Sequence, residues 1–344
     1  MAVIKGTDIC DFNLRSGDLE KMYEDLTNSA SYLVKSVKKD KDPSLIVSIL
    51  TDSQRGLATH GHLVLNQLFD RITRKGVNAL DLLGSYMNDS EEDIPVVEIN
   101  TNDFLIPWEW LYERPPQQLR DVSEFTVVVE PFWGCNRILM RRPLPKGRPL
   151  PTPLEFSQVP KVGLIVNTDL QFVDGEREHL YALKKAGKIV LDEFDREGVF
   201  RDWDLISNLN NFLQEDFDIV HIACHTGVDE ANNLYFEFSG ERRYLLNHLF
   251  STPTISLENP LVFINSCWTG ALSPRNTYSI VQRLWDRGAS NIIALESEVE
   301  SELASGFAQR FYENFLSGDQ LGNSHRISVQ IHLPILIRPQ IQVQ

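Results

Sequence analysis

The chain has 344 residues, of which 42% are hydrophobic and 24% charged, and its formal net charge is −15 at pH 7. This composition is ordinary for a globular protein with a large core, and the acidic balance argues against the broad basic surface that binding to nucleic acid requires. No apolar run approaches the roughly 18 residues needed to span a bilayer, and the first residues show no secretory leader, so we expect a cytosolic protein that does not bind membranes.

The first half of the chain has mixed helix and strand signals. Apolar residues recur at helical spacing in two segments, and β-branched and aromatic residues predict strands in two others. The predicted helices cover residues 19–37 and 44–72, and the predicted strands cover 94–100 and 124–132. We therefore expect an α/β subdomain over residues 1–145.

Between these two strands, the aromatic run "WEWLY" (Trp108–Tyr112) is expected to anchor a turn in the core. His60 and His62 flank Gly61 in the second helical segment. We expect these histidines to be solvated or to cap backbone groups and not to bind a metal.

A proline-rich segment separates the two halves. "RRPLPKGRPLPTPLEFSQVP" runs from Arg141 to Pro160, and its density of proline and glycine argues against regular structure. We predict a linker over residues 146–160 and a second subdomain over 161–320. Residues 321–344 are expected to form an irregular tail.

The second half alternates strands and helices regularly. Near-continuous apolar strands that alternate with helices predict a mostly parallel sheet covered on both faces, which is an α/β fold. The predicted strands are 161–169, 189–194, 217–224, 261–267 and 290–297, and the predicted helices are 175–187, 202–216, 276–289 and 302–318.

Two of these strands end at chemically active side chains. "DFDIVHIACHTG" reaches His225, and "LVFINSCWTG" reaches Cys267. Functional groups of open α/β sheets gather outside the carboxyl ends of the strands, and a histidine upstream of a cysteine is the order found in caspases. An imidazole can take the proton of a thiol and return it to a leaving amine, so His225 and Cys267 are candidate catalytic residues.

The other cysteines and the nearby His221 have simpler explanations. The four cysteines contain no CxxC pair and no metal-ligand spacing, so we expect neither a zinc site nor disulfides, and no cofactor. Cys224 should point to the opposite side of its strand from His225, into the core. His221 lies inside the strand, and we expect a buried histidine with satisfied hydrogen bonds.

Taken together, "DIVHIACHTG", "VFINSCWTG" and "IPWEWLYE" resemble the CHAT family of caspase-like cysteine peptidases. The resemblance extends from about residue 20 to 318 and includes "GEREHLYALKKA" and "FAQRFYENFLSG". It implies a caspase-like sheet over residues 161–320, preceded by a degenerate caspase-like subdomain without catalytic residues. It also implies that His225 is the base and Cys267 the nucleophile, with backbone N–H groups of Thr226 or Gly227 and of Cys267 as oxyanion donors.

The chain departs from the family pattern at three places. Thr226 stands where the family usually has the glycine that follows the base, the segment "ESEVESE" lacks an aspartate common before the late helix, and the C-terminal residues lack the usual aromatic and glycine ending. The altered residue at 226 puts the shape of the oxyanion loop in question.

The residues around such a site restrict which substrate side chain its pocket can accept. Asn265 is neutral where relatives specific for basic residues carry an acid, so we expect a neutral pocket lined by Asn265 and Trp268. Glu298 and Glu300 are the alternative source of an acidic pocket, although their position favours the start of a helix.

These observations predict a cysteine endopeptidase that forms a thioester with protein substrates. By resemblance, we expect a role in bacterial antiviral defence or regulated cell death, with activation by a separate sensor protein, because no repeat of about 34 residues is present. One alternative is a catalytically inactive scaffold that binds a sensor or effector, and another is a thiol acyltransferase or hydrolase acting on small molecules.

Overall fold

The computed structural model divides the chain into two compact units, residues 1–146 together with 317–344, and residues 147–316. The division falls within the proline-rich segment, between residues 146 and 147. The structure describes residues 2–4, 8–10, 21, 43–69, 96–101, 108–114, 131–143, 158–171, 173–196, 198, 200, 202–231, 233–246, 248, 257, 260–266, 280–281, 283–294 and 301–318.

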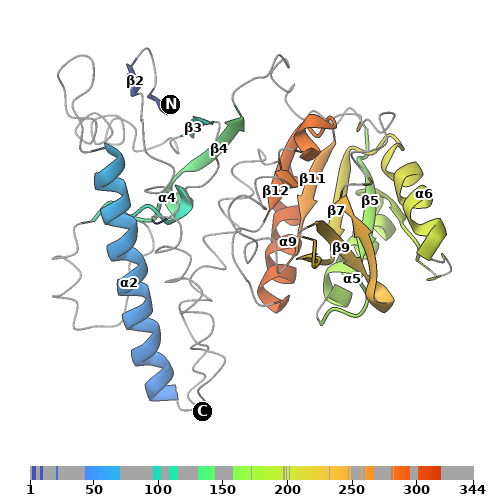
Figure 1. Ribbon diagram of the computed structural model, residues 1–344, viewed down its shortest axis with the longest axis horizontal. Helices are drawn as coiled ribbons and strands as arrows, with labels where there is room; N and C mark the ends of the chain where they lie inside the picture. The colour runs from blue at the N-terminus through green and yellow to red at the C-terminus, as the bar shows by residue number, and fades with distance from the viewer. Residues whose placement is uncertain are drawn as a thin grey trace. The chain divides into compact units, whose positions relative to one another are not determined.

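The first unit contains a four-stranded sheet, in the order β2-β1-β3-β4, and a long helix (Figure 1). The β1–β2 pair is antiparallel and the β3–β4 pair is parallel. Its elements are β1 (Ala2–Ile4), β2 (Asp8–Cys10), α2 (Pro43–Phe69), β3 (Val96–Thr101), η1 (Trp108–Trp110), α4 (Trp133–Asn136) and β4 (Ile138–Pro143).

An aromatic cluster forms the core of this unit. Trp108 of η1 and Trp133 of α4 stack at 6.3 Å between ring centroids, and Phe69 of α2 packs against both rings. Leu111 and Tyr112 are fully buried. The prediction that the Trp108–Tyr112 run is anchored in the core is confirmed.

The second unit is built on a five-stranded sheet in the order β12-β11-β7-β5-β6. All four strand pairs are parallel. The strands are β5 (Lys161–Val166), β6 (Val190–Glu193), β7 (Ile219–Ala223), β11 (Leu261–Ile264) and β12 (Asn291–Ala294). The α/β fold with a mostly parallel sheet is therefore confirmed.

A second, antiparallel sheet follows β7 directly. It has the order β10-β9-β8, and its elements are β8 (His225–Val228), β9 (Leu234–Phe238), η3 (Ser239–Glu241) and β10 (Arg242–Leu245). These three short strands were not predicted from the sequence.

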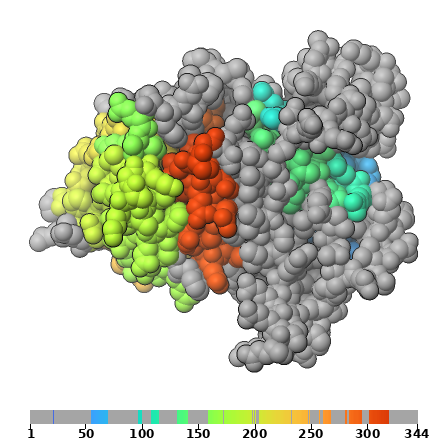
Figure 2. All heavy atoms as spheres, turned by 180° about the vertical axis from the view of Figure 1, so that it is seen from behind, coloured from blue at the N-terminus to red at the C-terminus, as the bar shows by residue number. Residues whose placement is uncertain are grey.

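Helices cover both faces of the parallel sheet (Figure 1). They are α5 (Val173–Lys185), α6 (Asp202–Leu213) and α9 (Ser301–Phe315), and residues 280–281 and 283–286 are also helical. Side chains of a strand alternate between faces, so His221 and Phe263 meet α9 on one face, while Val220 and Ile222 meet α6 on the other. Figure 2 shows the outer side of α9, in orange-red, exposed at the surface.

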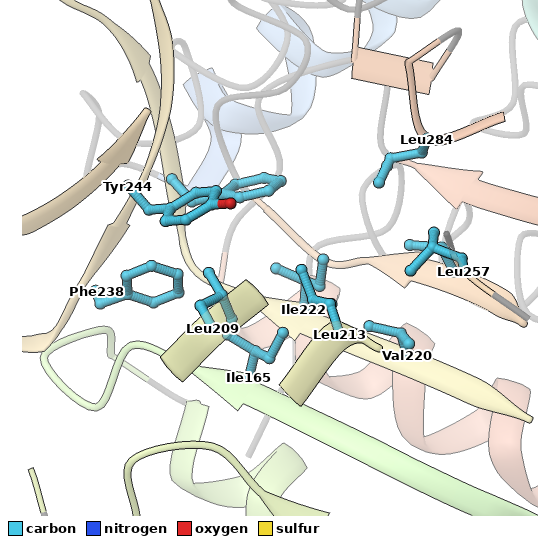
Figure 3. A pocket seen from close by; sticks show the side chains of 11 residues that line it. Ile165, Leu209, Leu213, Val220, Ile222, Phe238, Tyr244, Leu257 and Leu284 are labelled. Atoms are coloured by element: carbon cyan, nitrogen blue, oxygen red, sulfur yellow. The ribbon is translucent and has the colours of Figure 1, made fainter. Parts of the chain in front are cut away.

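The α6 side of the sheet is a dry hydrophobic core. Figure 3 shows Leu209 and Leu213 of α6 facing Val220 and Ile222 of β7 across a small gap. The gap has a volume of about 10 Å³ and is lined by apolar side chains together with Tyr244, whose hydroxyl donates a hydrogen bond to Asn210. A space no larger than one water molecule is a packing defect and not a ligand site.

Several boundaries differ from the sequence-based expectations. The predicted helix 44–72 appears as α2, which spans residues 43–69, and the predicted strand 94–100 appears as β3, which spans residues 96–101. Regular structure extends into the proline-rich segment, because β4 continues to Pro143; β4 is the edge strand of its sheet, where proline is tolerated. The predicted helix 19–37, apart from residue 21, most of the strand 124–132, the linker 146–157 and the tail 321–344 lie outside the described residues.

Candidate active site

The carboxyl ends of β5, β7 and β11 lie side by side at the C-terminal end of the parallel sheet. Val166 of β5 pairs with Ala223 of β7, and Ile264 of β11 pairs with Ile222. The ladder continues past the strands, because Asn167 N–H donates to the Ala223 carbonyl and Asn265 N–H donates to the Ile222 carbonyl, both at 2.8 Å. The segment after each of these strands therefore starts at the same end of the sheet.

His225 is the first residue of β8 and is partly buried. β7 ends at Ala223, so the predicted position of His225 beyond the end of the parallel strand is confirmed. Cys224 is fully buried in the apolar core, as expected. His225 pairs in register with Glu237 of β9, so the position of β9 determines the position of the histidine.

The loop after β5 holds β9 and the turn that follows it. The Asn167 side chain donates to the Glu237 carbonyl at 3.0 Å, and the Thr168 N–H donates to the Ser239 hydroxyl at 2.8 Å. The Asp169 carboxylate accepts from the Gly240 N–H at 2.6 Å. Three consecutive residues of the loop after β5 thus hold the small antiparallel sheet that carries His225.

The register of β8 shows which of Thr226 and Gly227 has a backbone N–H that is not used in the β8–β9 ladder. The Asp229 N–H donates to the Asn233 carbonyl, and hydrogen-bonded pairs alternate along an antiparallel ladder. Gly227 and His225 therefore form the hydrogen-bonded pairs with β9, whereas the N–H of Thr226 points away from β9. Because β8 is the edge strand of its sheet, Thr226 is the residue whose N–H lies outside the ladder.

A side-chain contact joins β8 to the segment after β11. The hydroxyl of Ser266 donates to the hydroxyl of Thr226 at 3.3 Å, and both residues are buried. Ser266 immediately precedes Cys267 in the chain, and Thr226 immediately follows His225. The contact therefore brings together the two segments in which the predicted catalytic residues lie.

Several predicted site residues fall outside the described part of the chain. These are Cys267, Trp268, Glu298 and Glu300. Glu302, the last of the alternating glutamates, lies in the first turn of α9, where a carboxylate is favoured by the helix dipole. The specificity expected from Trp268, Glu298 and Glu300 stays a prediction.

Near the carboxyl ends of these strands lies a buried polar cluster, formed by Glu176, His221, Asn265 and Tyr312. His221 is 0% exposed, and its Nε2 lies 2.6 Å from the carboxylate of Glu176 on α5. The pair does not meet the geometry of a hydrogen bond, so it is a close polar contact between the ring and the carboxylate. The expectation that His221 is buried is confirmed.

Tyr312 of α9 completes the surroundings of this histidine. Its hydroxyl lies 3.0 Å from Nδ1 of His221. Burial raises the pKa of Tyr312 well above its ordinary value, and the charge of Glu176 raises it further, so the hydroxyl stays protonated and donates to Nδ1 in the tautomer that carries its ring hydrogen on Nε2. On its other face, His221 stacks on Phe263 at 5.0 Å between ring centroids.

Asn265, predicted to line a substrate pocket, has its amide nitrogen in this cluster. Nδ2 donates to the Glu176 carboxylate oxygens at 2.9 and 2.8 Å and to the Ala304 carbonyl at 3.0 Å. Three acceptors surround this atom, which determines the orientation of the amide. A role of Asn265 in substrate binding stays a prediction.

Sequence reasoning missed Glu176 and Tyr312. The buried positions of α5 are Val173, Glu176, Leu180 and Leu183, a helical spacing that places one glutamate on the apolar face. A charged residue at such a position needs a buried partner, so this spacing could have identified Glu176 as part of a polar cluster.

Comparison with known proteins agrees with this architecture. Residues 104–326 match the CHAT domain family, a range that includes both histidines, the sheet and α9. A relative named "probable protease" from Vitiosangium sp. (strain GDMCC 1.1324) is 29% identical over 220 residues, which cover 59% of this chain and 26% of that protein. The chain thus aligns with about a quarter of the relative's length. With the family match over more than half of its residues and the strand-end arrangement described above, the chain belongs to the CHAT family.

Proposed function

We propose that this protein is a cysteine endopeptidase in which His225 is the general base and Cys267 the nucleophile. The observation that carries the proposal is the contact between Thr226 and Ser266, because each of these residues is the chain neighbour of one proposed catalytic residue. Membership of a caspase-like family and the printed name of the relative support the same activity.

The proposed reaction passes through a thioester. The imidazole of His225 takes the thiol proton of Cys267, and the thiolate attacks the scissile carbonyl. The N–H of Thr226, which lies outside the β8–β9 ladder, and the N–H of Cys267 are the proposed donors to the oxyanion. The leaving amine takes its proton from His225, and water then hydrolyses the thioester.

The setting of this activity is part of the proposal. We place the enzyme in the cytoplasm, in a bacterial defence or cell-death pathway in which a separate sensor protein activates it against protein substrates. Among the described residues, no helix combines the length and the apolar character needed to cross a membrane.

The test uses the full chain with single substitutions. Cys267→Ala and His225→Ala are expected to reduce proteolysis by a factor of at least 10³, because the nucleophile and its base act as a unit. The measurement is a proteome-wide search for new termini in the presence of each variant. The search is made in cells that also contain the proposed activating sensor, and wild-type protein that yields no termini beyond those of Cys267→Ala under activating conditions contradicts the proposal.

His221→Ala is the matched control. It removes the buried histidine of β7, four residues before His225, and is expected to lower stability by about 2–4 kcal/mol, because it leaves Glu176 without its imidazole partner. Activity per folded molecule should exceed that of His225→Ala by a factor of ten or more. A folded but inactive His221 variant beside an active His225 variant would reverse the assignment.

The inactive scaffold is the alternative favoured by a specific observation, the threonine at 226 in place of glycine. An electrophilic peptide distinguishes the two functions. Covalent labelling of Cys267 in the folded protein supports an enzyme, and absence of labelling together with tight binding of a partner supports a scaffold.

A further inference from the structure

We propose that Glu176 is a positioning residue for the active site, because its buried carboxylate holds the ends of the two strands that lead to His225 and Cys267. The inference rests on the proposed function and names the group that keeps the two segments in place.

The carboxylate of Glu176 is 3% exposed and contacts two different strands. Its Oε1 lies 2.6 Å from Nε2 of His221 on β7, and both of its oxygens accept from Nδ2 of Asn265, directly after β11. A buried carboxylate without partners is strongly unfavourable, so these contacts bind Glu176 to both strand ends at once.

The two partners of Glu176 lie close in sequence to the proposed catalytic residues. His221 precedes His225 by four residues, and Asn265 precedes Cys267 by two. Asn265 is also held by the Ile222 carbonyl through its backbone and by the Ala304 carbonyl through its side chain. Its neighbour Ser266 makes the contact to Thr226. A shift of Asn265 therefore displaces the residue that joins the two segments.

The carboxylate of Glu176 faces nitrogen atoms on both strand ends: Nδ2 of Asn265 donates to it, and Nε2 of His221 lies 2.6 Å from it. In the tautomer that accepts from Tyr312 at Nδ1, His221 carries its ring hydrogen on Nε2, the nitrogen beside the carboxylate. Asn265 donates from the other side. The site thus requires a group that only accepts, and a glutamine at 176 would turn its own N–H₂ toward the N–H₂ of Asn265.

The test measures alkylation of Cys267 by iodoacetamide in the full chain, followed by mass spectrometry of the modified peptide. Glu176→Gln keeps the volume of the side chain, and we expect the alkylation rate of Cys267 to fall roughly ten- to hundredfold, since small displacements of reacting groups have effects of this size. Asn265→Ala is expected to slow the reaction similarly.

The double variant Glu176→Gln/Asn265→Ala is expected to react no more slowly than the slower single variant, because Glu176 acts through Asn265. Leu183→Ala, on the buried face of the same helix, is the control for lost stability. It should lower the melting temperature at least as much as Glu176→Gln while leaving the alkylation rate within about twofold of wild type.

Each outcome decides the inference. Glu176→Gln protein that alkylates at the wild-type rate, fully multiplicative effects in the double variant, or an equal loss in Leu183→Ala overturns the positioning role. Wild-type Cys267 that reacts no faster than in the urea-unfolded chain overturns the proposed peptidase as well, so the two failures are distinguishable.

Discussion

At the scale of single residues, environment separates histidines that resemble each other in sequence. His221 and His225 are four residues apart, yet His221 is enclosed between Glu176, Tyr312 and Phe263, whereas His225 opens an edge strand and is partly exposed. An imidazole in the first environment has its two nitrogens engaged, and one in the second can meet a substrate. The difference in burial is the physical ground on which we propose His225, and not His221, as the base.

His179 of α5 provides a prediction about pH. Its Nε2 is buried and makes no hydrogen bond to any described residue. Burial lowers the pKa of His179 despite the opposing charges of Glu313 and Glu176, and Lys188 lowers it further. The unfolded chain therefore binds a proton more readily than the folded one, so this histidine reduces stability as the pH falls below about 6.5.

We expect the melting temperature of His179→Gln to fall less than that of wild type between pH 7.5 and pH 5.5, since glutamine does not titrate. Other groups titrate equally in both proteins and cancel in the comparison. Parallel melting curves across this pH range would show that burial of His179 does not affect its protonation.

At the scale of elements, α2 and the aromatic turn of the first unit are joined by a close backbone approach. A Cβ at Gly61 would overlap the carbonyl oxygen of Trp110 and lie 3.2 Å from the Tyr112 nitrogen. Nδ1 of the neighbouring His62 donates a hydrogen bond to the Tyr112 carbonyl at 3.0 Å, because a carbonyl oxygen only accepts. This confirms that His62 serves a backbone group.

Gly61→Ala is expected to destabilise the protein by about 1–3 kcal/mol, because the added methyl group must displace the backbone of the turn. Gly56→Ala on the same helix is the matched control. Outside the helix itself, no atom of the described residues lies within 4 Å of a Cβ at that position, so alanine should stabilise by about 0.5–1 kcal/mol through its better helix propensity. Urea denaturation measures both, and equal midpoints for the two variants would contradict the close approach.

At the scale of the whole molecule, the two units have separate cores. Residues of α2, β3, η1 and α4 form one cluster, which includes Phe69 and Trp133. Residues of α6 and the parallel sheet form the other, which includes Leu209 and Val220. Each unit therefore buries apolar side chains of its own, which is the condition for cooperative unfolding within a unit.

We expect calorimetry of the full chain to resolve more than one transition. Leu209→Ala, which enlarges an existing gap in the second core, should cost about 2–5 kcal/mol and lower one transition, and Gly61→Ala should lower another. A single transition that both substitutions shift by the same amount would show that the units unfold together.

The sequence alone was sufficient for the order and type of the main elements in the second unit. The apolar runs of β5, β7 and β11 and the four-residue spacing of Phe307, Phe311 and Phe315 on α9 predict what the structure contains, because burial on both faces of a sheet or on one face of a helix imposes these periods. The end of α5 was also predictable: Gly187 has φ +70°, and Gly187 and Lys188 donate to the Lys184 and Leu183 carbonyls.

Only the tertiary structure decided what lies around the strand ends. The strands β8, β9 and β10 are four or five residues long, too short for a clear period, and they are stabilised by the distant loop Asn167–Asp169. The position of Glu176 beside His221 and Asn265 joins its own helix to two segments that lie 45 and 89 residues away in sequence. Such contacts depend on how helices pack on the sheet, and local spacing in a single sequence carries no record of that packing.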